Sequence, residues 1–320
     1  MTGVPVIMDV DTGVDDALSL LFAVRHPGID LLAVTCVAGN TNVDQVTANT
    51  RYVLDAAGAG DVPVARGAAR PMLVPPAAAD HVHGADGLGG FSRPSDRRMS
   101  PLPAVELLRR QLMAAVGTGD RITLVPSAPL TNIALLLRTH PEVAAGIERI
   151  LFMGGSAGVG NATVAAEFNI WHDPEAAAIA LTAAGELDIP VTMYGLDVFG
   201  DVVITRAEAA SLRQALDPGA QLAGSLIEFA CNTFGTEEAT IGDAGTVCAV
   251  VDPEGLSTER FGVQVELGNG LARGQTLVDR RTWVGDHKAD PHQARPTMVD
   301  VALAVDARRY ADLWLATVGG

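Results

Sequence analysis

The chain has 320 residues, and no stretch of it has the composition of a linker, so we expect a single domain over residues 1–320. A formal net charge of −16 argues against nucleic acid or an anionic membrane as a partner, because both would favour a basic surface. Hydrophobic residues make up 48%, but every apolar stretch is broken before membrane-spanning length and the N-terminus lacks a basic leader, so we expect a cytoplasmic protein without a transmembrane helix.

Strand-like and helix-like segments alternate along most of the chain. In chain order, the patterns predict strands at Val4–Asp9, Asp30–Ala38, Arg121–Pro126, Ile150–Met153, Ile189–Tyr194 and Met298–Val305, and helices at Asp15–His26, Val43–Ala57, Pro103–Val116, Leu130–Thr139, Pro174–Ala183, Arg206–Ala215 and Ala307–Val318. Near the C-terminus, Gly268-Asn269-Gly270 separates strand-like segments Phe261–Leu267 and Leu271–Val278, which predicts a hairpin. This order predicts an α/β fold with a doubly wound, mostly parallel sheet and a small C-terminal β-hairpin.

Four aspartates follow the first predicted strand, in Asp9-Val10-Asp11-Thr12-Gly13-Val14-Asp15-Asp16. Side chains alternate along a strand, so Asp9 and Asp11 are expected on one face, and Gly13 permits a tight turn into the helix that Asp15 and Asp16 begin. Two carboxylates ~4 Å apart repel by about 4 kcal/mol at an effective dielectric of 20. Four that converge need a cation or must hold protons, and oxygen ligands suit Ca²⁺ or Mg²⁺. The stabilisation of acidic residues at a helix N-terminus would explain only Asp15 and Asp16.

The stretch Gly67–Ser100 is too polar and too rich in Gly and Pro for a helix or strand, and too long for an idle connection. We interpret it as a flexible cover over the site that could hinge at Asp86–Gly90, with a disordered surface loop as the alternative. The aspartates, Asn40, Ser127 and Met153–Asn169 all follow predicted strands, so they should converge on the carboxyl-end rim of the sheet, where ligands bind in open α/β folds.

The cysteines and the single lysine exclude other kinds of chemistry. Cys36, Cys231 and Cys248 are odd in number and far apart, which indicates buried thiols rather than a disulfide framework. Lysine occurs once, as Lys288, so mechanisms that need a lysine in the middle of the chain lose that residue.

The aspartate stretch resembles the D-x-D-x-G-x-D-D signature of the nucleoside hydrolases, the inosine–uridine-preferring N-ribohydrolase family. The resemblance covers most of the chain. Its further motifs are Val37-Ala38-Gly39-Asn40, His81-Val82-His83-Gly84, Leu124-Val125-Pro126-Ser127-Ala128-Pro129-Leu130-Thr131-Asn132, Met153-Gly154-Gly155, Gly160-Asn161-Ala162-Thr163, Ala166-Glu167-Phe168-Asn169-Ile170, Asp173-Pro174-Glu175-Ala176-Ala177, Asp243 and Asp252-Pro253.

The resemblance implies hydrolysis of the N-glycosidic bond of ribonucleosides to free base and ribose, and a homodimer or homotetramer. It implies that Ca²⁺ is held by Asp11, Asp16, Asp243 and the backbone carbonyl of Ser127, and that Asp11 is also general base to the metal-bound water. The implied substrate-binding residues are Asp15, Asn40, Met153, Asn161, Glu167 and Asn169.

Several of these residues have other interpretations. Asn161 could be a turn residue after Gly160, and Asp173 before Pro174 is better interpreted as a helix N-cap, so Asp173 is left out of the site. Glu167 and Asn169 would share one face if extended, and acidic residues among apolar neighbours need partners. Ser127 replaces the threonine common in the family, a change that a backbone carbonyl ligand tolerates.

The sequence departs from the family pattern at position 242. In the inosine–uridine type a histidine immediately precedes the late metal-binding aspartate and acts as acid to the departing base, and in the purine-specific type a tryptophan stands there. Here Ile241-Gly242-Asp243 has a glycine, and Phe229–Thr240 also aligns poorly. His83 is the nearest remaining candidate for contact with the base, with solvated surface as the alternative.

Three other classes are weighed against this hydrolase. A haloacid dehalogenase-type phosphatase also begins with strand–Asp-x-Asp, but Gly13 and the solitary Lys288 argue against it. A non-catalytic riboside- and metal-binding protein would keep the site and lose the chemistry, and the retention of Asp11 ranks it below the enzyme. An EF-hand is excluded because Leu20 stands where its loop needs a glutamate.

Overall fold

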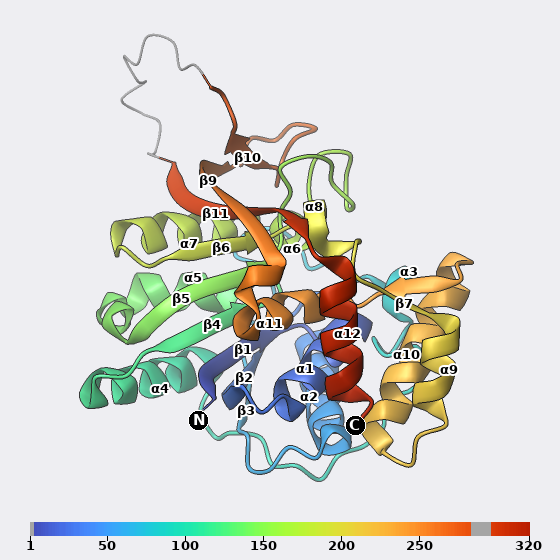
Figure 1. Ribbon diagram of the computed structural model, residues 1–320. Coiled ribbons are helices and arrows are strands. Elements are labelled where there is room, and N and C mark those ends of the chain that lie inside the picture. Colours follow the sequence, from blue (N-terminus) through green and yellow to red (C-terminus); the bar gives the residue numbers. More distant parts are fainter. Residues whose placement is uncertain (1–2, 283–295) are drawn as a thin grey trace.

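A nine-stranded sheet forms the centre of the protein in the computed structural model, which describes residues 3–282 and 296–320 (Figure 1). The strand order is β10-β9-β11-β6-β5-β4-β1-β2-β3. The bounds are β1 Val4–Val10, β2 Ile29–Cys36, β3 Val64–Arg66, β4 Ile122–Pro126, β5 Ile147–Met153, β6 Val191–Tyr194, β9 Leu256–Val265, β10 Thr276–Asp279 and β11 Thr297–Val305. From β3 to β11 in this order the strands pair in parallel, and β9 and β10 add an antiparallel edge. The predicted fold class is confirmed.

Helices cover both faces of the sheet because its inner strands are apolar on both sides, as β4 shows by being buried at every residue. One core contains residues of α1 (Val14–Arg25), α2 (Val43–Ala57), α11 (Ala244–Val251) and α12 (Ala307–Val318). The other contains residues of α4 (Ala104–Thr118), α5 (Thr131–Thr139) and α7 (Pro174–Glu186), which lie on the left in Figure 1. The short helical segments are α3 Asp80–His83, η1 Pro141–Gly146, α6 Phe168–His172, α8 Leu196–Phe199 and η2 Pro253–Gly255.

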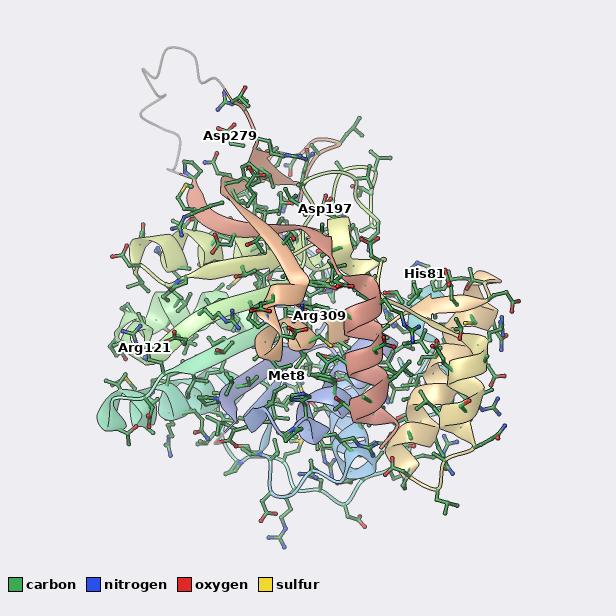
Figure 2. The ribbon with its side chains drawn as sticks, viewed as in Figure 1. Met8, His81, Arg121, Asp197, Asp279 and Arg309 are labelled. Carbon is green, nitrogen blue, oxygen red and sulfur yellow. The ribbon has the colours of Figure 1, made fainter. Side chains whose placement is uncertain are left out.

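The chain changes its direction of travel across the sheet at β1. It runs from β1 outward through β2 to β3, and then returns to place β4 on the other side of β1. The carboxyl ends of β1 and β4 therefore border the switch point, which is where open α/β sheets bind ligands. In Figure 2, Arg121 just before β4 lies on the left, whereas His81 of α3 lies on the right.

A helical excursion separates the body of the sheet from the last site residue. β7 (Val203–Thr205) and β8 (Glu238–Thr240) pair antiparallel, and α9 (Arg206–Arg213) and α10 (Pro218–Phe234) lie between them in the chain. The Ile241 backbone N–H then donates to the Val202 carbonyl, which returns the chain to the rim just before α11. Neither α10 nor α11 was predicted, although Asp217 before Pro218 is a helix-start signal and its carboxylate accepts from the Ala220 N–H.

Three further expectations need correction or refinement. The predicted hairpin pairs as expected, but its strands end at Val265 and resume at Thr276, so the turn is longer than Gly268-Asn269-Gly270. The stretch Gly67–Ser100 contains a short helix, α3, although we predicted none. Its Asp86–Gly90 portion is tied down rather than loose, because the Asp86 carboxylate accepts from the backbone N–H groups of Leu88, Gly90 and Ser92.

The remaining bulk expectations concern thiols and membranes. Cys36, Cys231 and Cys248 are free and buried, as predicted. Across residues 3–282 and 296–320, the structure contains no helix with the length and apolar character to cross a membrane. Lys288 lies outside the described residues.

Candidate functional site

The turn that leads from β1 into α1 builds the floor of the candidate site. Gly13 is the N-cap of α1 and its backbone passes close to two side chains. A Cβ at Gly13 would lie 2.7 Å from both Asn40 Nδ2 and His83 Nδ1. Only glycine fits there, and this close approach brings Asp15 and Asp16, in the first turn of α1, to the rim.

Asp243 joins these two aspartates from the other end of the chain. One carboxylate oxygen from each of Asp15, Asp16 and Asp243 lies within 4.8 Å of the other two. Burial, and after it the charge of Asp15, raises the pKa of Asp16 to about 7. Burial, then the charges of Asp15, Asp16 and Asp11, raises the pKa of Asp243 well above its ordinary value. These carboxylates cannot all be ionised comfortably without a compensating cation or bound protons.

Asp11 lies against this group and carries an unpartnered oxygen. Its Oδ2 accepts a 2.7 Å hydrogen bond from the Asn40 backbone N–H. Its Oδ1 is buried and has no hydrogen-bond partner among the described residues. Burial, and then the charge of Asp16, raises the pKa of Asp11 well above its ordinary value. An unsatisfied buried oxygen beside other carboxylates suits contact with a positive or proton-donating group.

Asp16 is the best-supported member of the group. Its Oδ2 accepts from the Gly13 N–H at 2.9 Å and from Asn40 Nδ2 at 3.3 Å. The Ser127 hydroxyl, at the end of β4, donates to Asp16 Oδ1 at 2.9 Å. Asn40 after β2 and Ser127 after β4 thus hold Asp16 from the strands on either side of β1, as the rim argument predicts. The part taken by the Ser127 side chain was not predicted.

Asp9 lies apart from this group. Its Oδ1 accepts from the Thr35 hydroxyl at 2.5 Å and from Asn132 Nδ2 at 2.8 Å. Burial raises its pKa to about 7. The expectation that Asp9 converges with the other three aspartates is therefore not met, and Asn132 is a supporting residue whose role was not predicted.

Glu167, Asn169 and Met153 meet at the end of β5. Glu167 is the N-cap of α6, and its carboxylate accepts from the backbone N–H groups of Gly155, Asn169 and Ile170. Burial nevertheless raises the pKa of Glu167 to about 7. Asn169 Nδ2 donates to the Met153 carbonyl at 3.2 Å. The shared face suggested for an extended chain does not apply, because Glu167 is the N-cap and Asn169 lies in the first turn of α6.

Asn161 and Asp173 match the local interpretations given for them. Asn161 is exposed in the loop after β5, and its side-chain oxygen accepts from the Phe168 N–H at 2.9 Å. A role in ribose binding stays a prediction for Asn161. Asp173 caps α7 by accepting from the Ala176 N–H at 3.1 Å, as predicted.

His83 is buried at the end of α3, so the alternative of a solvated surface histidine is wrong. Its Nδ1 accepts a 3.1 Å hydrogen bond from the Val14 N–H and lies 3.8 Å from Asp15 Oδ1. Burial lowers the pKa of His83. Because Nδ1 accepts, the neutral ring carries its proton on Nε2.

Among the described residues, no basic side chain neutralises the charge of the aspartate cluster. Within residues 3–282 and 296–320, no arginine or lysine forms an ion pair with the carboxylates of Asp11, Asp15, Asp16 or Asp243. A cluster of oxygen ligands with an unpartnered buried atom fits a hard divalent cation. The cluster can therefore hold a metal ion.

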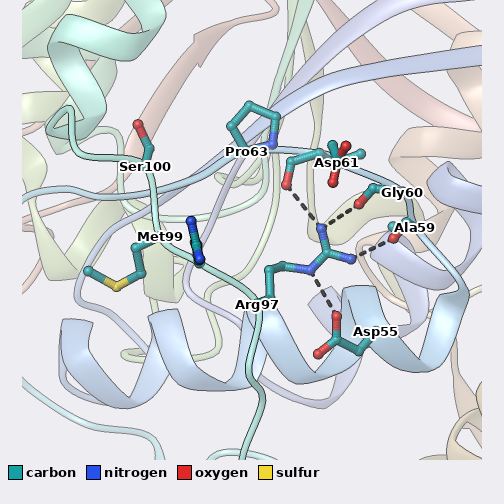
Figure 3. A pocket seen from close by; sticks show the side chains of 10 residues that line it. Asp55, Ala59, Gly60, Asp61, Pro63, Arg97, Met99 and Ser100 are labelled. Carbon is teal, nitrogen blue, oxygen red and sulfur yellow. Dashed lines mark hydrogen bonds and ion pairs between the residues drawn. The ribbon is translucent and has the colours of Figure 1, made fainter.

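A separate cavity lies beside Pro63, just before β3, the strand at one edge of the sheet (Figure 3). Its volume is about 530 Å³. Arg97 on its wall donates to the carbonyls of Ala59, Gly60 and Val62 and to the Asp55 carboxylate. These bonds use the guanidinium to fasten the chain, so we assign Arg97 a structural role.

The fold and the cluster together define an α/β enzyme with an acidic, metal-competent site at the switch point of a parallel sheet. The family model described as inosine-uridine preferring nucleoside hydrolase matches residues 6–312. The chain belongs to this family and is an N-glycosyl hydrolase, which confirms our prediction of the family and the enzyme class.

Relatives and solved structures agree with this assignment over nearly the whole chain. A pyrimidine-specific ribonucleoside hydrolase RihA from Shewanella sp. (strain MR-7) is 37% identical over 315 residues, 97% of this chain and 94% of that protein. The RihA from Shewanella baltica (strain OS185) is 40% identical, with 88% of each chain covered. The plant nucleoside hydrolase PpNRh1 superposes with a TM-score of 0.89 at 29% identity, with 99% of each chain covered. The purine-preferring ribonucleoside hydrolase from Gardnerella vaginalis gives 0.87 at 27%, covering 99% of this chain and 98% of that one.

Proposed function

We propose that this enzyme hydrolyses the N-glycosidic bond of ribonucleosides in a Ca²⁺-dependent reaction in which Asp11 is the general base. The observation that carries the proposal is the unpartnered Oδ1 of Asp11 beside carboxylates packed within 4.8 Å of one another. Asp11, Asp16, Asp243 and the Ser127 backbone carbonyl would hold the ion, and the spacing of Asp15 makes it a further candidate ligand. A bound Ca²⁺ would lower the pKa of a ligated water and orient it toward the sugar.

Asp11 is suited to take a proton. Burial and the charge of Asp16 raise its pKa, so its carboxylate gains from contact with a cation or a proton. The Asn40 N–H holds its Oδ2, which leaves Oδ1 as the atom that accepts the proton. The same backbone contact fixes the direction in which Oδ1 points.

The remaining polar residues would position the ribose. Asp15, Asn40, Asn161, Glu167 and Asn169 are the proposed partners of its hydroxyls, with Met153 packed beside them. Glu167 already accepts three backbone hydrogen bonds, so its carboxylate is held rigidly before any substrate arrives. A preorganised acceptor of this kind stabilises a sugar that becomes positively charged as the bond breaks.

His83 is the proposed contact to the departing base. With Nδ1 accepting from Val14, the neutral ring offers Nε2–H, so His83 would donate a hydrogen bond rather than transfer a full proton. Bases that depart easily should therefore be hydrolysed fastest. Because the RihA relatives at 37–40% identity are named pyrimidine-specific, we propose pyrimidine ribonucleosides as the first natural substrates to test.

The test is release of free base from a panel of nucleosides, with and without a chelator. We expect turnover with Ca²⁺, none after complete demetallation, and recovery when Ca²⁺ is added back. Full activity of the demetallated protein would refute the metal mechanism. Binding of nucleosides without any release of base would instead support the alternative of a non-catalytic riboside-binding protein. Assembly as a homodimer or homotetramer stays a prediction, to be tested by light scattering.

A further inference from the structure

Gly242 stands immediately before Asp243 in a conformation that only a residue without a side chain adopts easily there. Its φ is +50°. A Cβ at this position would lie 2.7 Å from Phe199 Cζ and 2.9 Å from Asp15 Cβ. The backbone and the surrounding atoms therefore both exclude a side chain at position 242.

The ring that fills this space comes from a different part of the chain. Phe199 is the last residue of α8, the short helix after β6. The Thr240 hydroxyl donates to the Phe199 carbonyl at 2.6 Å and accepts from the Gly242 N–H at 2.9 Å. One hydroxyl thus ties Phe199 and Gly242 together, so their contact is built into the fold.

Phe199 borders the open part of the carboxylate cluster. The Asp15 side chain is 21% exposed, whereas the residues Asp11, Asp16 and Asp243 are at most 2% exposed. A ligand therefore reaches the cluster past Asp15. Phe199 Cζ and Asp15 Cβ both border the space that a Cβ at Gly242 would fill, and His83 Nδ1 lies 3.8 Å from Asp15 Oδ1.

Part of the Phe199 ring is accessible to a ligand. Phe199 is half-buried, and its buried part packs against a small apolar cluster that contains Met153 and Tyr194. A half-buried aromatic ring at the mouth of a site is suited to contact a planar, weakly polar group.

We propose that Phe199 is the aromatic surface against which the base of the nucleoside lies, and thus a specificity-determining residue. Its ring provides a planar apolar surface beside Asp243. This surface occupies the space that a side chain at position 242 would otherwise fill. The base is recognised there by stacking and shape. This inference rests on the proposed hydrolysis of nucleosides but makes a separate claim about binding.

The experiment compares a ligand that carries a base with one that does not. Pseudouridine has a carbon–carbon glycosidic bond and resists N-glycosidic hydrolysis, so its dissociation constant can be measured by calorimetry alongside that of D-ribose, both with Ca²⁺. Stacking of a base on an aromatic ring contributes about 1–3 kcal/mol, so Phe199→Ala should weaken pseudouridine binding by about 5- to 150-fold. Ribose affinity should stay within about twofold.

Two further variants guard against a general loss of structure. Phe199→Leu keeps an apolar side chain in contact with the Met153 cluster but removes the planar face, so it should also weaken pseudouridine selectively. Phe261→Ala removes a half-buried ring on β9 that packs in the core on the other face, so it should leave both affinities unchanged. Unchanged pseudouridine binding in both Phe199 variants, or equal loss of pseudouridine and ribose, would overturn the proposal.

Position 242 supplies an independent arm. Gly242→Ala should lower the melting temperature more in the wild-type background than in the Phe199→Ala background. Only the wild-type background has the Phe199 ring with which the new Cβ would clash. Equal effects in both backgrounds would contradict the proposed packing. A wild-type protein that binds pseudouridine but hydrolyses no nucleoside would defeat the proposed function and leave the role of Phe199 standing.

Discussion

Asp11→Asn tests the proposal that Asp11 is the general base. The amide has the same shape as the carboxylate, and its oxygen can keep the 2.7 Å hydrogen bond from the Asn40 N–H. Its NH₂ group then replaces the unpartnered Oδ1, so the side chain can neither take a proton nor contribute a negative charge to a metal. Loss of a general base alone lowers kcat by about 10²–10⁴-fold, and weaker metal binding adds to that.

The same change should stabilise the metal-free fold. Burial and Asp16 together raise the pKa of Asp11, which means that its ionised form is unfavourable in the folded state. A neutral amide removes that penalty, so we expect the melting temperature without metal to rise at pH 8, while the gain on adding Ca²⁺ shrinks. The assay pairs p-nitrophenolate release from p-nitrophenyl riboside with thermal unfolding in chelator and in Ca²⁺.

Asp173→Asn is the matched control. Both oxygens of this buried aspartate accept hydrogen bonds, from Ala176 N–H on one side and from Met72 N–H and the Thr131 hydroxyl on the other. An amide there leaves donors facing donors and should destabilise the protein by about 1–3 kcal/mol while kcat stays close to wild type. Wild-type kcat in Asp11→Asn, or a fall in its metal-free stability like that of Asp173→Asn, would refute the role given to Asp11.

Three other outcomes follow from the contacts of single side chains. His83→Ala should slow the hydrolysis of uridine and inosine much more than that of p-nitrophenyl riboside. The exposed His81→Ala is the control, and equal slowing of all three substrates in His83→Ala would exclude His83 as the contact to the base. Ser127→Ala, but not Ser127→Thr, should weaken Ca²⁺ binding about 10-fold or more, because the hydroxyl donates to Asp16 Oδ1 and a hydrogen bond to a charged group contributes about 1.5–3 kcal/mol. Burial lowers the pKa of His172 from 6.5 to about 4, so its stabilising contribution is complete above pH 6.5 and is lost as pH falls toward 4. The fall in unfolding free energy between pH 6.5 and 4 should shrink by up to about 3 kcal/mol in His172→Gln, and an unchanged pH profile would contradict this assignment.

The alternating core of the fold could be predicted because its signals are local. Apolar runs such as Ile122–Pro126 and the periodic helix Val43–Ala57 carry their own pattern, and the structure places them where expected. The rim residues Asp16, Asn40 and Ser127 followed from one rule, that parallel strands bring their carboxyl ends to a common edge.

The elements that escaped prediction are those that tertiary contacts decide. The segment α11 is rich in β-branched valine, which would suit a strand, yet its residues are buried as far as Val250 and form a helix. In α10, Pro218-Gly219 and Gly224 obscure the helical pattern, although Gly224 closely approaches α9 at the Ala209 carbonyl. The contact between Phe199 and Gly242 joins residues far apart in the chain, so no local sequence pattern predicts it.

The buried acids of this protein differ in how many hydrogen bonds their carboxylates accept. Glu167 accepts three backbone hydrogen bonds and Asp173 is satisfied at both oxygens, so both are held in place by the fold itself. Asp9 has one unpartnered oxygen, but its pKa is raised by burial alone while Thr35 and Asn132 oppose the shift. Asp11 has both an unpartnered oxygen and neighbouring carboxylates that raise its pKa. An acid in that position gains most from a cation, which is why we propose the catalytic role for Asp11 although Asp9 is equally buried.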